Sequence, residues 1–131
     1  MIELTTFVMD NYPPARSWGV ERVTAWLSWF SSRGLLLCVR QCGRLAAVAC
    51  VRCVSDTKEA EVYYTHRESG SLLFAELVIA KSRGAFRKLW GAVLRTRFPS
   101  VRRISWERGL RGRGIREFNF GSTERLIYGR Q

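Results

Sequence analysis

The sequence predicts an α+β fold in which a twisted mixed sheet, mostly antiparallel, is flanked by two main helices. Residues 20–31 and 85–98 carry the apolar repeat of amphipathic helices, and several short segments are rich in strand-forming residues. The chain has 131 residues, of which 47% are hydrophobic. This length and composition favour one packed domain over residues 1–131.

The first segments are a predicted strand and a predicted helix. Residues 1–10 are expected to form a short strand, which the two prolines at 13 and 14 end because proline cannot continue a ladder or a helix. In the helix over residues 20–31 the apolar positions are Val20, Val23, Trp26, Leu27 and Phe30. Ser17 is its candidate cap and Gly34 ends it.

A β-hairpin is predicted next. Residues 35–40 and 44–54 are rich in strand formers, and Gly43 supplies the turn between them. We expect a polar loop over residues 55–60, and residues 61–66 are a candidate for a further short strand.

The second half of the chain contains the central strand and the clearest helix. Residues 72–80 are apolar except for Glu76, which predicts a strand covered on both faces. The helix over residues 85–98 leads to a strand over 101–106, so these two strands are expected to be parallel. The remaining expectations are an exposed loop over 107–114 and a closing hairpin from 115–120 and 125–128.

Four cysteines lie in or beside the predicted hairpin: Cys38, Cys42, Cys50 and Cys53. Cys50 and Cys53 have the Cys-x-x-Cys spacing of some zinc sites. However, they lie on one predicted strand without a glycine-rich knuckle, and residues three apart on a strand point to opposite faces. We therefore predict buried or half-buried free thiols and no metal site.

The net charge of +11 is the most unusual bulk property. Arginine grips phosphate and carboxylate groups, so nucleic acid, a phosphorylated cofactor or an acidic protein is an expected partner. A basic solvated surface without a specific partner is the alternative. No apolar run approaches the ~20 residues of a membrane span, and the N-terminal residues lack a secretory signal. We expect a cytoplasmic protein with no membrane partner.

The turn after the central strand has features of an anion site. Its residues are Lys81, Ser82, Arg83, Gly84 and Ala85. Free N–H groups and the dipole at a helix N-terminus attract phosphate, and a glycine lets phosphate approach the backbone. An ordinary strand-to-helix turn that needs a glycine is the alternative.

The predicted order of elements over residues 20–106 resembles the GNAT superfamily of acyl-CoA-dependent N-acyltransferases. In that family a central strand leads through a phosphate-binding turn, usually Gln/Arg-x-x-Gly-x-Gly/Ala, into the principal helix. Lys81 and Gly84 match this spacing, whereas Phe86 stands at the final small position. The resemblance implies a GNAT-like domain that binds acyl-CoA, with the pyrophosphate at residues 81–85.

The resemblance also implies a base, often a glutamate, and an acid such as tyrosine. Glu76 is the candidate base, because an apolar environment favours the neutral form of a carboxyl group; a solvated edge position is the alternative. Tyr64 is the candidate acid, although Tyr63 and Tyr64 as strand neighbours would place one ring in the core and one in solvent. His66, the single histidine, is interpreted as structural.

Three functions therefore remain open. The first is an acyl-CoA-dependent N-acyltransferase, and the second is an inactive GNAT-like protein of an accessory or phage type. The third is a basic nucleic-acid-binding module, supported by charge and by two Arg-Gly pairs at 111–114. Its candidate contacts are Arg87, Arg95, Arg102, Arg103, Arg111 and Arg113.

Overall fold

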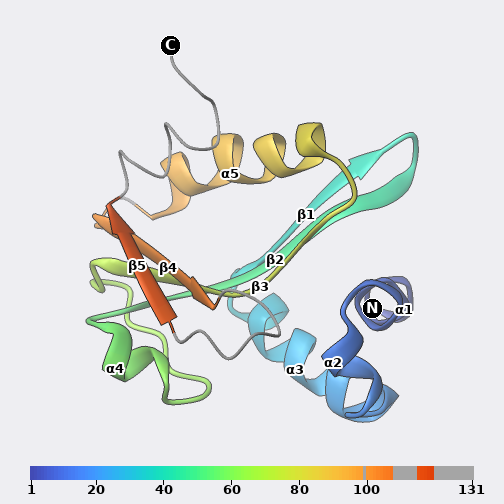
Figure 1. The fold of residues 1–131 in the computed structure, drawn as a ribbon, viewed down its shortest axis with the longest axis horizontal. Coiled ribbons are helices and arrows are strands. Elements are labelled where there is room, and N and C mark those ends of the chain that lie inside the picture. Colours follow the sequence, from blue (N-terminus) through green and yellow to red (C-terminus); the bar gives the residue numbers. More distant parts are fainter. Residues whose placement is uncertain (99, 108–114, 120–131) are drawn as a thin grey trace.

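The computed structural model describes residues 1–98, 100–107 and 115–119. In chain order the elements are α1 (Ile2–Asn11), α2 (Pro13–Arg16), α3 (Val20–Ser32), β1 (Leu36–Gln41), β2 (Arg44–Val54), α4 (Thr57–Ala60), β3 (Leu72–Ala80), α5 (Arg83–Arg97), β4 (Arg103–Glu107) and β5 (Ile115–Asn119). The strands form one mixed sheet in the order β1-β2-β3-β4-β5 (Figure 1). The predicted α+β class is confirmed.

The first three strands form an antiparallel meander. The turn between β1 and β2 is Cys42-Gly43, and both residues have a positive φ, 54° and 76°. Two successive positive φ angles match the right-handed twist of a hairpin. β3 then pairs antiparallel with β2 along almost its full length, so both the predicted hairpin and the central strand are confirmed.

The parallel step places β4 beside only half of β3. Residues 72–75 of β3 pair with residues 103–106 of β4, after the connection through α5. In the part of the chain that the structure describes, no strand pairs with β3 on this side beyond Ala75. β5 continues the sheet antiparallel to β4, whereas the second arm of the predicted closing hairpin, 125–128, and most of the predicted loop over 107–114 lie outside the described residues.

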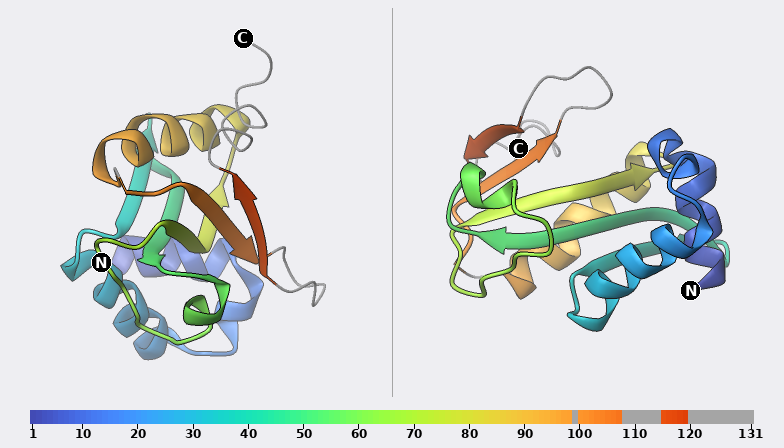
Figure 2. Two further views of the ribbon diagram at one scale, coloured as in Figure 1. Left: turned by 90° about the vertical axis from the view of Figure 1, so that its left-hand side faces the viewer. Right: turned by 90° about the horizontal axis from the view of Figure 1, so that it is seen from below.

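Helices cover the sheet on both faces (Figure 2). On one face α5 places Leu89 and Trp90 in a core with the inner residues of β2 and β3. On the other face α1 and α3 form a second core, in which Trp26 and Phe30 are buried. The buried side chains of the two helices belong to the apolar faces that the helical repeat predicts.

The N-terminal segment is a helix, so the predicted strand over residues 1–10 is wrong. The apolar residues Ile2, Leu4 and Val8 are compatible with a period of two, but Leu4 and Val8 also lie one helical turn apart. Both are buried against α3, where the hydroxyls of Thr5 and Thr24 are 3.1 Å apart. Packing against α3 selects the helical period over the period of two, and the local sequence pattern gives no sign of this contact.

Several boundaries also differ from the predictions. Helix α2 begins at the two prolines, which are tolerated in a first turn because its N–H groups need no helical acceptor. Gly19 caps α3, while the hydroxyl of Ser17 donates to the carbonyl of Pro14. Within the predicted polar loop, Asp56 caps the short helix α4. Helix α5 begins at Arg83, so three of the five residues of the predicted anion-binding turn form its first turn.

Residues 61–66 form no strand. Tyr64 has a φ of 57°, a left-handed conformation that interrupts extended structure. Hydrogen bonds from the Arg52 guanidinium to the carbonyls of Val62 and Thr65 fix this segment. The segment is therefore a loop whose shape is set from β2.

The thiols divide between core and surface. Cys50 and Cys53 are buried free thiols in the two different cores, which confirms their opposite orientation on β2. Cys38 and Cys42 are free and exposed, against the expectation of burial. Burial raises the pKa of the Cys53 thiol to about 11, so this group stays protonated at neutral pH. Within residues 1–98, 100–107 and 115–119, no helix has the length and apolarity needed to cross a bilayer.

Replacing Trp90 by alanine should lower the free energy of unfolding by about 3–5 kcal/mol, because it leaves a large cavity under α5. Trp90 is 6% exposed and its ring contacts Phe86. Urea denaturation measures the effect. The exposed neighbour Lys88, replaced by alanine, is the control and should change stability little. Equal stabilities of the two variants would contradict the packing of α5 on the sheet.

Candidate functional site

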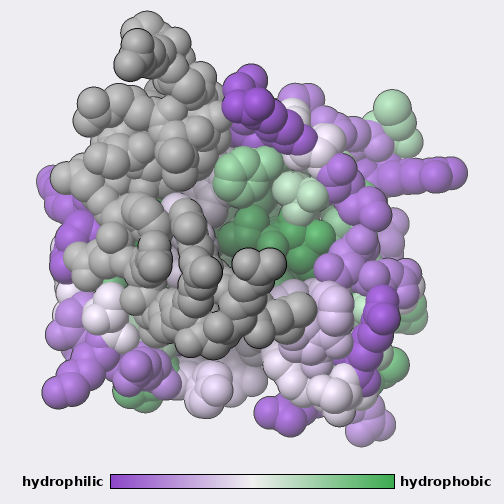
Figure 3. All heavy atoms as spheres, in the orientation of Figure 1, coloured by the Kyte–Doolittle hydropathy of each residue, from purple (hydrophilic) through white to green (hydrophobic). Residues whose placement is uncertain are grey.

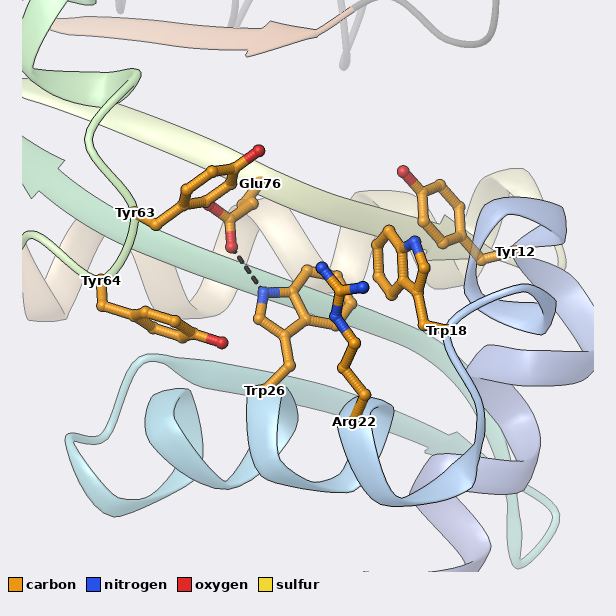
Figure 4. A pocket seen from close by; sticks show the side chains of 7 residues that line it. All are labelled: Tyr12, Trp18, Arg22, Trp26, Tyr63, Tyr64 and Glu76. Carbon is orange, nitrogen blue, oxygen red and sulfur yellow. Dashed lines mark hydrogen bonds between the residues drawn. The ribbon is translucent and has the colours of Figure 1, made fainter.

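A pocket of about 290 Å³ opens on the sheet face that α1 and α3 cover. Figure 4 shows its lining, which comes from the α1–α2 and α2–α3 connections, α3, the loop between α4 and β3, and β3 itself. The seven lining residues are Tyr12, Trp18, Arg22, Trp26, Tyr63, Tyr64 and Glu76. We call this site the aromatic pocket.

Glu76 reaches the pocket because of a β-bulge. On β2, Cys50 pairs with Leu77 and the next residue, Val51, pairs with Ala75, so Glu76 is an extra residue on β3. An extra residue breaks the alternation of side chains between the two faces. Consequently Leu77 lies in the core under α3 and Glu76 also faces that side, where it contacts Trp26.

The Glu76 carboxylate is held by two neighbours. Its Oε2 accepts a hydrogen bond of 2.7 Å from the indole Nε1–H of Trp26. Its Oε1 accepts from Nε and Nη2 of Arg52 at 3.2 and 3.0 Å. The Glu76 side chain is 14% exposed and that of Arg52 only 1%. The carboxylate is therefore fixed at the floor of the pocket; Glu76 lies beyond the pairing with β4, but its side chain is not solvated as the alternative required.

Arg52 also fastens the loop that forms one side of the pocket. Its Nη1 donates to the carbonyls of Val62 and Thr65, and its Nη2 donates to the carbonyl of Ala60. With the two bonds to Glu76, these interactions use all five guanidinium N–H donors. These hydrogen bonds from a buried cation fix the loop, and they therefore also fix the positions of its two tyrosines, Tyr63 and Tyr64.

Aromatic rings form most of the pocket wall. Trp18 meets Trp26 edge to face at a centroid distance of 5.2 Å, and Tyr12 meets Trp18 at 6.1 Å. Tyr63 and Tyr64 are both exposed, at 79% and 51%, so the expectation that one of them is in the core is wrong. Tyr64 also packs against Trp29. Both tyrosine rings therefore face the pocket from the solvent side (Figure 4).

The two predicted catalytic residues, Glu76 and Tyr64, line the same pocket. They are brought together from β3 and from the loop that Arg52 holds. The single histidine, His66, lies at the end of this loop outside the pocket lining, and its Nδ1 accepts a 3.0 Å hydrogen bond from the backbone N–H of Cys53. This contact agrees with its structural interpretation.

The predicted anion-binding residues lie at the far end of β3. Ser82 caps α5 by accepting from the N–H of Ala85. The Lys81 ammonium donates instead to Asn11 of α1, on the opposite face of the sheet from α5. In the described part of the chain no hydrogen bond is found for the N–H groups of Arg83 and Gly84, which begin the helix.

The first turn of α5 is open to a ligand. A Cβ added at Gly84 would meet only the Ser82 hydroxyl, at 4.0 Å. Phe86, which replaces the small residue of the GNAT pattern, is half-buried and packs on the core beside Trp90. Among the residues that the structure describes, only the Ser82 hydroxyl therefore lies within 4 Å of a Cβ placed at Gly84.

Of the six arginines of the nucleic-acid hypothesis, the structure describes the side chains of three. Arg103 donates to the Ser55 carbonyl and the Ser71 hydroxyl, Arg102 is exposed, and Arg87 is half-buried. The side chain of Arg95 and the whole of Arg111 and Arg113 lie outside the described residues. The described arginines therefore provide no structural support for nucleic-acid binding beyond the net charge of +11.

Sequence reasoning did not select Arg52, Trp18 or Arg22. A usable signal existed for Arg52, because it is the one charge between residues 45 and 54 and Glu76 is the one charge in the next apolar strand. Two lone opposite charges on neighbouring buried strands indicate an ion pair. No such signal marks Trp18 and Arg22, whose role depends on the approach of α2 and α3 to β3.

Removing either member of the buried ion pair should strongly destabilise the protein, because the other charge stays buried without its partner. We expect Arg52→Met and Glu76→Gln each to lower the free energy of unfolding by about 3–5 kcal/mol. The double variant should lose less than the sum of the two, as measured by urea denaturation. Arg67→Met, which removes an exposed pair with Glu59, is the control and should have a much smaller effect. Additive losses would contradict the coupling.

Stability should fall as the pH drops below the ordinary His66 pKa of 6.5. Desolvation lowers the His66 pKa in the folded protein; the charges of Arg33 and Arg52 lower it further and that of Glu68 opposes them. The unfolded chain therefore takes up a proton that the folded chain resists. His66→Asn preserves an acceptor for Cys53 and does not titrate. Urea denaturation between about pH 7 and about pH 5.5 should show a smaller loss for this variant; equal losses would refute the prediction.

Comparison of the chain with protein-family models, curated proteins and solved structures gave no match.

Proposed function

We propose that the protein is a GNAT-like N-acyltransferase that moves an acyl group from acyl-CoA to an amine bound in the aromatic pocket. The observation that carries the proposal is the bulge at Glu76. The bulge directs a fixed carboxylate into the pocket, next to Ala75, where the pairing of β3 with β4 ends. Bulges that redirect a side chain are frequent beside active sites.

The edge of β3 that no described strand pairs with beyond Ala75 supports a path for the cofactor. The phosphopantetheine arm of coenzyme A contains two amides, and an extended amide chain can pair with an unpaired strand edge. Figure 3 shows apolar surface gathered between α5 and the sheet on the face that also carries this edge. An arm bound along residues 77–80 would connect the pocket with the first turn of α5.

The first turn of α5 supports the pyrophosphate site. The N–H groups of Arg83 and Gly84 point along the helix dipole, and Arg83 adds a cation. Open space at Gly84 and the inward packing of Phe86 are compatible with a bound phosphate. Lys81 would contribute only if it left Asn11.

Acyl-CoA would supply an activated thioester, and side chains of the protein would accept and donate the protons of the reaction. Glu76 is placed to accept a proton from the amine, directly or through water, as the nitrogen bonds to the thioester carbonyl. When the carbon–sulfur bond breaks, the Tyr64 hydroxyl is the proposed proton donor to the departing thiolate. Two exposed free thiols, Cys38 and Cys42, are compatible with the reducing cytoplasm, where we expect the protein.

Two alternatives remain proposals. An inactive accessory or phage-type protein would bind no acyl-CoA, or would bind it without transfer. A nucleic-acid-binding module rests on the net charge alone, and an acidic protein partner rests on the same charge.

Acyl-CoA binding tests the cofactor site by calorimetric titration with acetyl-CoA. We expect Gly84→Val to weaken binding about tenfold or more by blocking backbone approach, and Arg83→Gln to weaken it less. Both positions are exposed, so folding should be preserved. Lys88→Gln, an equal charge change one turn along α5, is the control. No binding by the wild type at millimolar acetyl-CoA would refute the proposal.

Transfer itself is measured as release of the free coenzyme A thiol with aromatic primary amines as acceptors. Tyr64→Phe should lower the rate by about 10²–10⁴, because it removes only the proposed acid. The ring and its contact with Trp29 are retained. Tyr63→Phe, a neighbouring exposed tyrosine of the same pocket, is the control. Binding of acetyl-CoA without transfer to any amine would favour the inactive alternative.

A further inference from the structure

The lining of the aromatic pocket includes one carboxylate and one guanidinium, those of Glu76 and Arg22. The Glu76 carboxylate bonds to Trp26, whereas the Arg22 guanidinium lies over the ring of Trp18 at 5.6 Å. The two indoles touch edge to face, and Figure 4 shows the Arg22 guanidinium on the side of Trp18 that faces Glu76. Figure 4 shows all four side chains on the pocket wall. A ligand bound in the pocket can therefore meet an acceptor on Glu76 and a cation on Arg22.

Glu76 can accept a further hydrogen bond. A carboxylate offers about four lone-pair sites, and its three protein donors are two from Arg52 and one from Trp26. Arg52 neutralises the charge of Glu76. Glu76 therefore contributes a hydrogen-bond acceptor of fixed direction and only weak long-range attraction for cations. This part of the pocket suits the N–H groups of an amine.

Arg22 has its donors available. It is exposed at the start of α3, and in the described part of the chain it makes no hydrogen bond or ion pair, only the contact with Trp18. Its charge disfavours a ligand that carries positive charge alone, since the one carboxylate of the pocket is already paired. A guanidinium with a planar fork of free donors is suited to a carboxylate.

We propose that the aromatic pocket binds a small amino-carboxylic acid with an apolar or aromatic side chain, its amine on Glu76 and its carboxylate on Arg22. This inference rests on the proposed function, because it identifies the class of acceptor amine. The rings of Tyr12, Trp18 and Trp26 would enclose the side chain. A volume of about 290 Å³ lies near the lower limit for small-molecule sites and suits a single amino acid.

The test is tryptophan fluorescence titration of the whole chain in the absence of acyl-CoA. Three probes distinguish the contact of the ligand amine from the contact of its carboxylate. They are phenylalanine, 2-phenylethylamine, which lacks the carboxylate, and 3-phenylpropionate, which lacks the amine. We expect phenylalanine to bind about tenfold or more tightly than either analogue, as one charge-assisted hydrogen bond would give.

Matched variants assign the carboxylate contact. Arg22→Gln should lower the affinity for phenylalanine to about that of the same variant for 2-phenylethylamine, and it should not weaken binding of 2-phenylethylamine, because a repulsive cation is removed. Arg33→Gln is the control, because Arg33 is also exposed and stacks on a tryptophan, Trp29, at 4.3 Å, but lies outside the pocket lining. Retained phenylalanine affinity in Arg22→Gln would overturn the assignment.

The outcomes also separate this inference from the acyltransferase proposal. Equal binding of phenylalanine and 2-phenylethylamine, or no binding of either, overturns the inference, whatever acetyl-CoA does. Selective binding of phenylalanine without any acyl transfer supports the inference and leaves the acyltransferase proposal refuted. Because the titration contains no acyl-CoA, a defective cofactor site cannot produce a false negative.

Discussion

The buried pair of Arg52 and Glu76 is the interaction on which the rest of the site depends. A guanidinium that is 1% exposed has lost its water, and only a full set of protein acceptors offsets that cost. Arg52 finds them in the Glu76 carboxylate and three backbone carbonyls, and its Cζ lies 5.0 Å from the centroid of the Phe74 ring. One side chain thus links β2, β3 and the loop after α4.

The same pair accounts for two local irregularities. The bulge is favourable because it turns Glu76 toward Arg52 and Trp26, while Leu77 still reaches the core. A left-handed conformation at Tyr64 costs about 1–2 kcal/mol, and the bonds from Arg52 to neighbouring carbonyls hold the chain in that shape. Neither irregularity can relax without leaving a buried polar group unpaired.

Much of the fold could be predicted from the sequence, because several segments show a single clear period. β2, β3, α3 and α5 lie where apolar repeats placed them, and the parallel step followed from the strand–helix–strand order. α1 was missed because its few apolar residues suit both periods, and residues 61–66 because contacts from β2 override their strand propensity. The candidate site was found only in part: Glu76 and Tyr64 were selected as unusual residues, but the indoles and Arg22 meet them only through tertiary packing.

The seven residues of the aromatic pocket all lie between positions 12 and 76, whereas the proposed cofactor contacts lie between 77 and 86. Under the proposed function, recognition of the acceptor and binding of the acyl donor would be encoded by consecutive stretches of sequence that meet at the bulge. In evolution such an arrangement lets substitutions at positions such as Trp18 or Arg22 change the accepted amine while the donor-binding part is untouched. Related chains would then be expected to differ most before β3, and a new specificity could arise by exchanging that first stretch alone.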